Sequence, residues 1–120
     1  MADLVNSSIL NTIKNMLGVD ETFNGFDAEI MIDINSAFMN LHQLGVGPNE
    51  SFQISSEQDN WSDFTEDETQ LSGIKTYIYL KTRLLFDPPT NSFLVNSIDK
   101  QIQELEWRLN VNAEGAFNGG

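Results

Sequence analysis

Few residues of this chain have the types and spacing needed for catalysis or metal binding. There is one histidine, His42, and there is no cysteine, so a histidine metal cluster and a thiolate site are both excluded. No Gly-x-Ser-x-Gly motif is present to hold a serine nucleophile. Carboxylates are plentiful, but most fall in expected loops or on polar helix faces, where nothing tunes them for acid–base work. We expect no enzymatic activity, no metal and no cofactor.

The segment after Val19 has a partial resemblance to a calcium-binding loop. With Asp20 as its first position, Asn24 and Gly25 fit the fifth and sixth positions. The twelfth position should hold a bidentate glutamate, but it is Met31. We therefore interpret this segment as a turn rich in Asp, Asn and Gly.

The element that positions the other residues runs from Thr65 to Pro89. Thr65 and Glu68 have the spacing of a capping box. Asp87 precedes Pro88 and Pro89, which end a helix. About twenty residues lie between these signals, which corresponds to roughly 30 Å of helix. We predict that this is the central helix of the domain.

The predicted central helix has a wide apolar face and one misplaced charge. Its apolar half contains Leu71, Ile74, Tyr77, Ile78, Leu80, Leu84 and Leu85, and its polar half contains Ser72, Lys75, Thr76, Tyr79, Thr82 and Arg83. Lys81 falls in the middle of the apolar half. It must either extend its ammonium group to water or pair with an internal carboxylate, because an unpaired buried charge is costly.

Three more helices are expected around this one. The first spans Ser8 to Leu17 and is capped by Asn6 or Ser7, and the second spans Asp27 to Leu44. The last begins near 90–92 and runs to about Val111. We expect Met16 of the first helix and Leu94 of the last helix to lie in their core stripes. A short β-hairpin or extended excursion is expected near 51–64, where Trp61 and Phe64 would serve as anchors. The predicted fold is mainly all-α, with one helical domain over 1–112 and a flexible tail over 113–120.

The net charge of −12 is concentrated in one half of the chain. Residues 1–68 contain thirteen acidic residues and one basic residue, Lys14, whereas residues 69–120 contain five of each. Such a surface does not attract nucleic acid or anionic lipid. It either keeps the protein soluble, repels DNA or meets a basic partner. No apolar run is long enough to span a membrane, and the first residues do not resemble a signal peptide, so we expect synthesis and use in a cytoplasm.

Two helices carry apolar residues away from their core stripes. Ile32 and Met39 lie opposite the stripe of the second helix. They are either scattered exposed residues or a contact surface for another chain. On the last helix, Trp107 lies off the stripe in a group with Phe93, Lys100 and Val111, and Arg108 is a further candidate interface residue. Trp107 either packs under the 51–64 excursion or the first helix, or belongs to an interface, where Trp and Arg are frequent.

Several segments together resemble the head–tail connector (adaptor or head-completion) proteins of long-tailed double-stranded DNA phages. They are Tyr77 to Lys81, Leu84 to Pro89 with its Phe86-Asp87-Pro88-Pro89 run, Glu104 to Leu109, and the motif Trp61-Ser62-Asp63-Phe64. The similarity covers roughly Phe52 to Leu109. The first fifty residues carry no recognised signature of this family.

This resemblance implies a small helical subunit that forms a ring, commonly of twelve copies, in the virion. The ring would dock on the portal protein, extend the DNA channel without binding DNA specifically, and meet a downstream neck or tail-completion protein. Assembly would take place in the host cytoplasm. An acidic DNA mimic or regulator that binds a basic partner is the alternative function.

Overall fold

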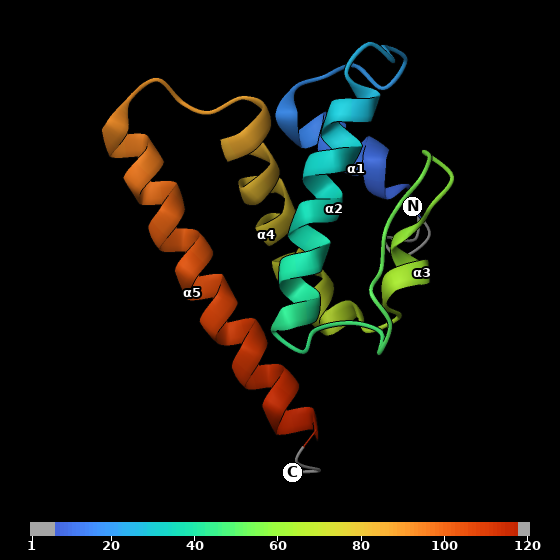
Figure 1. The fold of residues 1–120 in the computed structure, drawn as a ribbon, viewed down its shortest axis with the longest axis vertical. Helices are drawn as coiled ribbons and strands as arrows, with labels where there is room; N and C mark the ends of the chain where they lie inside the picture. The colour runs from blue at the N-terminus through green and yellow to red at the C-terminus, as the bar shows by residue number, and fades with distance from the viewer. Residues whose placement is uncertain (1–6, 118–120) are drawn as a thin grey trace.

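The computed structural model describes residues 7–117 of the chain, and the side chains of residues 7–113. Five helices occur in this range: α1 (Ile9–Leu17), α2 (Asp27–Gln43), α3 (Trp61–Phe64), α4 (Glu68–Phe86) and α5 (Ser92–Phe117). Helix α4 packs against α1, α2 and α5, and α1 packs against α2 (Figure 1). The all-α prediction and the central position of this helix are confirmed.

Helix α1 is capped at both ends by its own sequence. The Ser8 side chain accepts a hydrogen bond from the Asn11 backbone N–H at 3.2 Å. Gly18 ends the helix with a φ of 81°, a conformation that glycine adopts without strain. The predicted caps were Asn6 and Ser7, whereas the cap is Ser8; Asn6 lies outside the described residues.

The start of α4 differs from the prediction. Thr65 does not cap this helix, because it ends the short helix α3, where its N–H donates to the Trp61 carbonyl at 2.9 Å. Asp67 is the cap of α4 and accepts from the Thr69 N–H at 3.0 Å. The capping-box spacing belongs instead to α3, where the Asp63 carboxylate accepts from the Asn60 N–H at 2.9 Å.

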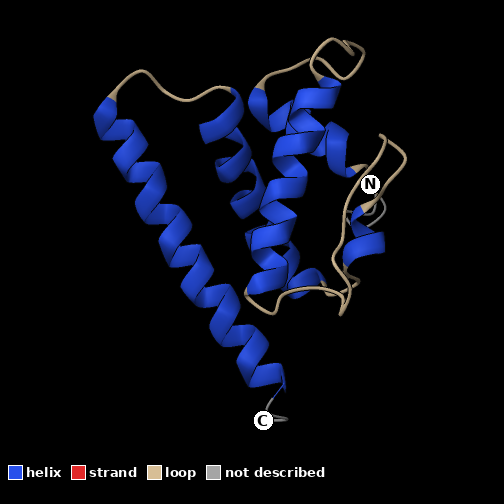
Figure 2. Ribbon diagram, in the orientation of Figure 1, coloured by secondary structure: helices blue, strands red, loops and turns tan. Residues whose placement is uncertain are grey.

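The predicted excursion is non-helical over residues 51–60, but its last four residues, Trp61–Phe64, form helix α3, and no strand forms within residues 7–117 (Figure 2). The backbone of Ile54 forms hydrogen bonds with a side chain and not with a neighbouring strand. Asn35 of α2 donates to the Ile54 carbonyl at 2.9 Å and accepts from the Ile54 N–H at 2.8 Å. Trp61 and Phe64 are buried beside Phe38 of α2. These contacts hold the excursion against the helices.

Four residues contradict the predicted helix faces. Thr82, predicted to be polar and outward, is buried, whereas Leu85, Leu94 and Met16, predicted to lie in the core, are exposed. The reason is tertiary: Met16, Leu85 and Leu94 each lie in the first or last turn of a helix, where neighbouring segments cover them less. Helix α5 also continues to Phe117, beyond the predicted end near Val111. Residues 118–120 of the predicted tail lie outside the described residues.

Candidate assembly surfaces

The loop that resembled a calcium site is closed by its own hydrogen bonds. The Asp20 carboxylate accepts from the Thr22 N–H at 2.8 Å and from the Thr22 hydroxyl at 2.7 Å. The hydroxyl bond first, and then the backbone bond, lower the pKa of Asp20. Within the described residues, no group of three His, Asp or Glu side chains could hold a metal ion. His42 is exposed.

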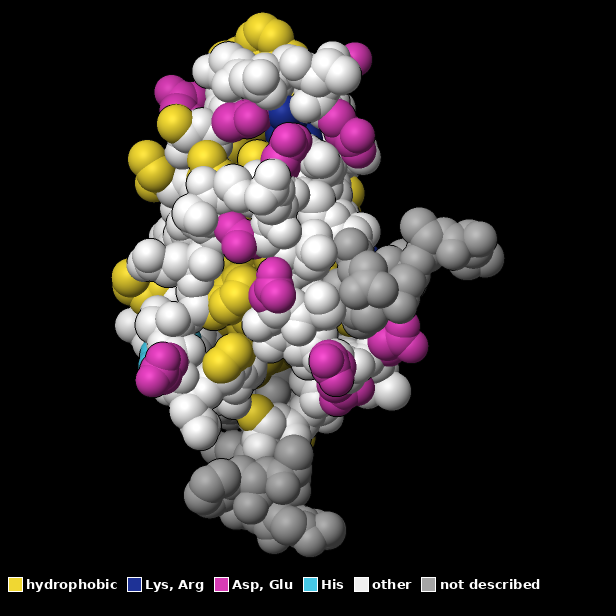
Figure 3. Space-filling model, turned by 90° about the vertical axis from the view of Figure 1, so that its right-hand side faces the viewer, with side chains coloured by type: hydrophobic (Ala, Val, Ile, Leu, Met, Phe, Trp, Pro, Cys, Tyr) yellow, Lys and Arg dark blue, Asp and Glu magenta, His cyan; other side chains and the backbone are white. Residues whose placement is uncertain are grey.

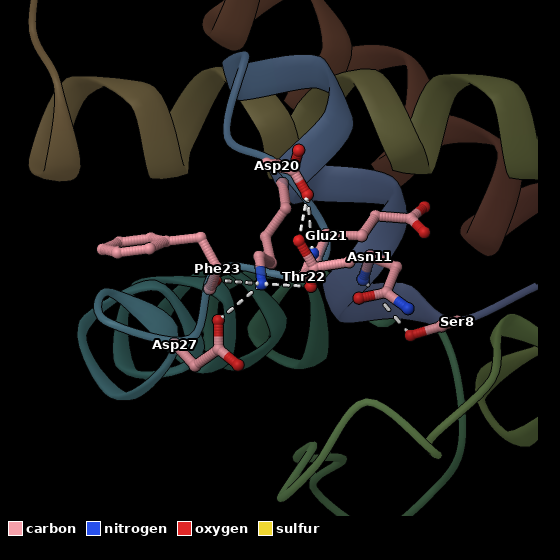
Figure 4. A network of polar contacts seen from close by, with 8 residues as sticks. Ser8, Asn11, Asp20, Glu21, Thr22, Phe23 and Asp27 are labelled. Atoms are coloured by element: carbon pink, nitrogen blue, oxygen red, sulfur yellow. Dashed lines mark hydrogen bonds and ion pairs between the residues drawn. The ribbon is translucent and has the colours of Figure 1, made fainter.

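A buried lysine fixes this loop, and it is not the lysine that the sequence singled out. Lys14 of α1 is 1% exposed. Its Nζ donates to the Glu21 carbonyl at 3.0 Å and the Phe23 carbonyl at 2.7 Å, and lies 2.8 Å from the Asp27 carboxylate (Figure 4). This network joins α1, the loop and the start of α2. The sequence contained one feature that could have pointed to this role of Lys14: it is the single basic residue among the first 68 residues.

Lys81, by contrast, is partly exposed and forms no ion pair with another described residue. Of the two alternatives, the structure favours extension of its ammonium group toward water. An internal ion pair of the kind considered for Lys81 exists in this fold, but it is formed by Lys14 with Asp27.

A hollow lies between the 45–48 loop and the start of α4. Its volume is about 660 Å³, and its described lining contains one ionisable side chain, Asp67. The left-handed Gly47 is needed here, since a Cβ atom would lie 2.5 Å from the Phe64 ring. The lining offers no set of groups for catalysis.

A smaller groove of about 380 Å³ lies where α2 meets the end of α4. Its lining combines apolar and acidic residues: Glu29, Ile32, Asp33, Leu85 and Phe86. Burial, and then the charge of Glu29, raise the pKa of Asp33. The groove therefore holds crowded negative charge beside exposed apolar surface.

Aromatic rings continue this apolar surface onto the α1–α2 loop. Phe26 packs edge-on against Phe86 at 5.3 Å and against Phe23 at 5.2 Å, measured between ring centres. Phe23 and Phe26 are both exposed, and the Lys14 network holds the backbone that carries them. We call the groove and these two residues the acidic–apolar surface.

Helix α5 has one face bound to the core and one face free. On the core side, the Tyr77 hydroxyl donates to the Glu106 carboxylate at 2.7 Å, and the Asn110 side chain donates to the Leu44 carbonyl at 3.0 Å. Burial first, and then this bond to Glu106, raise the pKa of Tyr77. These contacts fix which face of α5 is turned outward.

The outward face of α5 contains the apolar residues that were predicted to lie off the core. Phe93 is 76% exposed and Trp107 is 68% exposed, and Val111 is also exposed. Arg108 pairs with Glu104 at 2.6 Å. Lys100 lines a hollow of about 270 Å³ with Phe93, Asn96 and Ser97. On α2, Ile32 and Met39 are likewise exposed.

The residues that carried the family resemblance are mostly structural. Trp61 and Phe64 are buried, and the Trp61 indole N–H donates to the Thr12 hydroxyl at 3.1 Å. Asp63 completes the capping box of α3 with Asn60, Phe86 packs on Phe26, and Asp87 ends α4. Pro88 and Pro89 lie in the turn before α5.

The described residues form a helical domain that exposes apolar side chains on α2 and α5. A model of the phage connector protein family matches residues 9–116. The chain therefore belongs to the phage connector protein family, as its resemblance indicated, and the match includes most of the first fifty residues. No curated protein and no solved structure gave a significant match.

Membership in this family gives the chain a structural role in a phage particle, where it works together with other phage proteins. The family is not known for enzymatic activity. No described helix is long and apolar enough to cross a membrane.

Proposed function

We propose that this protein forms a ring at the head–tail junction of the virion. The ring docks beneath the portal protein, extends the DNA channel and meets the next neck or tail-completion protein, during assembly and during genome ejection. We expect twelve copies. Synthesis and assembly take place in the host cytoplasm before the protein enters the particle.

The observation that supports a ring is that exposed apolar faces occur on two different helices. Ile32 and Met39 project from α2, whereas Phe93 and Trp107 project from α5, and α4 packs against both helices. A ring built from head-to-tail contacts requires two different surfaces on every subunit. The interface residues expected from the sequence, including Arg108 and Val111, are accessible for such contacts.

The charge distribution supports a channel through which DNA passes without being held. Figure 3 shows many acidic side chains, and few basic ones, on the side that carries the 51–60 segment and α3. Like charge repels the phosphate backbone and leaves no site for specific binding. We propose that this acidic side of the N-terminal half, residues 1–68, lines the lumen. A ring structure with these residues wholly on its exterior would contradict this part of the proposal.

The direct test is to mix the purified protein with the portal protein of the same phage and to examine the mixture by electron microscopy. We expect ring-shaped complexes in which an added layer extends the portal channel. The portal protein alone is the control. The net charge of −12 favours one other function, an acidic DNA mimic. Stable binding to a basic DNA-binding protein, without any portal complex, would support that function and refute the connector ring.

A further inference from the structure

The structure assigns the two halves of a subunit–subunit contact: the outward face of α5 docks on the acidic–apolar surface of a second copy of this chain. This inference rests on the proposed ring and specifies which surfaces form it. The contact pairs Phe93, Lys100 and Trp107 of one copy with α2 and the end of α4 of the next.

Charge selects this pairing. Copies with a net charge of −12 repel one another, so a stable contact must bring opposite charges together. Lys14 is buried on Asp27, Arg108 is paired within its own helix, and the three bases of α4 (Lys75, Lys81 and Arg83) are partly covered. Lys100 is exposed and forms no ion pair with another described residue. It is therefore available to a neighbouring copy.

The groove supplies the matching negative charge. Glu29 and Asp33 line it, and neither forms an ion pair with a described residue. Burial, and then the neighbouring Glu29, raise the pKa of Asp33, so a cation placed between the two carboxylates would relieve this crowding. The groove has room for a large side chain beside Ile32 and Leu85.

The spacing along the two helices also matches. Phe93, Lys100 and Trp107 follow one another at seven-residue intervals and share one face of α5. Each interval is about 10 Å along the helix. If Lys100 lies beside Asp33, the two aromatic residues come to lie near Phe26 at one end and Met39 at the other. Both of those residues are exposed and apolar.

The direction of the helices agrees with rotational symmetry. Helices α2 and α5 run in the same general direction, from top to bottom in Figure 1. A rotation about an axis along that direction leaves the direction of both helices unchanged. Helix α5 of one copy would therefore lie parallel to α2 of the next copy. The contact joins two different surfaces, so the first and last copies of an open chain each keep one unused surface. These two surfaces bind each other when the ring closes.

Cross-linking tests this pairing without interference, because the chain has no cysteine of its own. Ser36 lies between Ile32 and Met39 on the exposed face of α2, and Gln103 lies between Lys100 and Trp107 on α5; both are exposed. We would prepare Ser36→Cys and Gln103→Cys, mix them at high concentration, and add a short thiol-reactive cross-linker. The mixture should form covalent dimers several-fold faster than either variant alone. A matched mixture of Gln58→Cys and Gln103→Cys should stay at background.

A charge reversal then tests the ionic part of the contact. Lys100→Glu in the Gln103→Cys copy should slow cross-linking on the order of tenfold, because it brings like charges together across the contact. Asp33→Lys in the Ser36→Cys copy should restore the rate. Thermal melting of each variant checks that the fold is retained.

Equal cross-linking in the matched and control mixtures, or no cross-linking at high concentration, would overturn the pairing. Predominant homodimers of the Ser36→Cys variant would overturn the pairing in favour of a symmetric dimer. Cross-linking of Ser36→Cys to added portal protein would overturn it as well, and would assign the groove to the portal. Portal-bound rings without the Ser36–Gln103 cross-link would refute this contact and leave the connector function intact. The cross-link without portal complexes would support the contact and refute portal docking.

Discussion

Replacing Lys14 by methionine removes a buried cation that joins three parts of the fold. Its ammonium group bonds the carbonyls of Glu21 and Phe23 and pairs with Asp27. Lys14→Met keeps most of the side-chain volume but leaves the carboxylate and two carbonyls without their donor. Breaking a buried ion pair from one side costs about 3–5 kcal/mol. Because Asp27 is 22% exposed and water can reach it, we expect a loss of about 3 kcal/mol.

Thermal and denaturant unfolding measure this loss, which corresponds to a decrease in Tm of about 10 to 15 °C for a domain of this size. Lys81→Met is the matched control, because Lys81 is partly exposed and forms no ion pair with a described residue. It should leave stability unchanged or raise it. The double variant Lys14→Met/Asp27→Asn should recover part of the loss. If Lys14→Met costs no more than Lys81→Met, the assignment of the ion pair to Lys14 is wrong.

Four further predictions concern other parts of the structure. Trp107→Ala should impair ring formation on the portal but leave Tm unchanged, since Trp107 is exposed; equal losses in both measurements would place it in the core. Thr82→Val should raise the free energy of unfolding by about 1 kcal/mol, because the buried Thr82 hydroxyl has no hydrogen-bond partner among the described residues; a lower denaturant midpoint would reveal a missed partner. Tyr77→Phe should cost about 1.5–3 kcal/mol, the range for a bond to a charged acceptor, and should increase hydrogen exchange in α5 more than in α1; uniform exchange would contradict a local role. The pKa of Asp33 is raised in the folded state, so the protonated Asp33 carboxyl group favours folding at low pH. This stabilisation is lost as the pH rises through the raised pKa of the folded state. Asp33→Asn should therefore gain stability relative to the natural chain between acidic and neutral pH, and a difference that does not vary with pH would refute this.

The sequence located most helix boundaries but misplaced one start. Thr65 and Glu68 have capping-box spacing, yet Asn60 and Asp63 form the box that exists, one short helix earlier. Both pairs satisfy the local pattern. Burial of Trp61 and Phe64 beside Phe38 selects between them, and that contact is between segments far apart in the chain.

The candidate surfaces were predictable in part. Ile32, Met39 and Trp107 project from their helices as the periodicity indicated. Leu85 and Phe26, which complete the acidic–apolar surface, were not expected there. Helical periodicity tells which residues share a face, but it does not tell where along its length a helix is covered by its neighbours.

The sequence by itself determined the all-helical class, the central helix, the absence of cysteine chemistry and the family. The first three follow from local signals: apolar periodicity, caps, prolines and composition. The family follows from the resemblance of segments such as Trp61–Phe64 and Leu84–Pro89 to phage connector proteins. Only the tertiary structure decided which lysine carries the internal ion pair. Lys81 lies at the centre of an apolar pattern but near enough to the surface to reach water, whereas Lys14 lies at the end of a short helix that the α1–α2 loop folds over. The cost of burying a charge depends on every segment that covers it, and one helix seen alone does not contain that information.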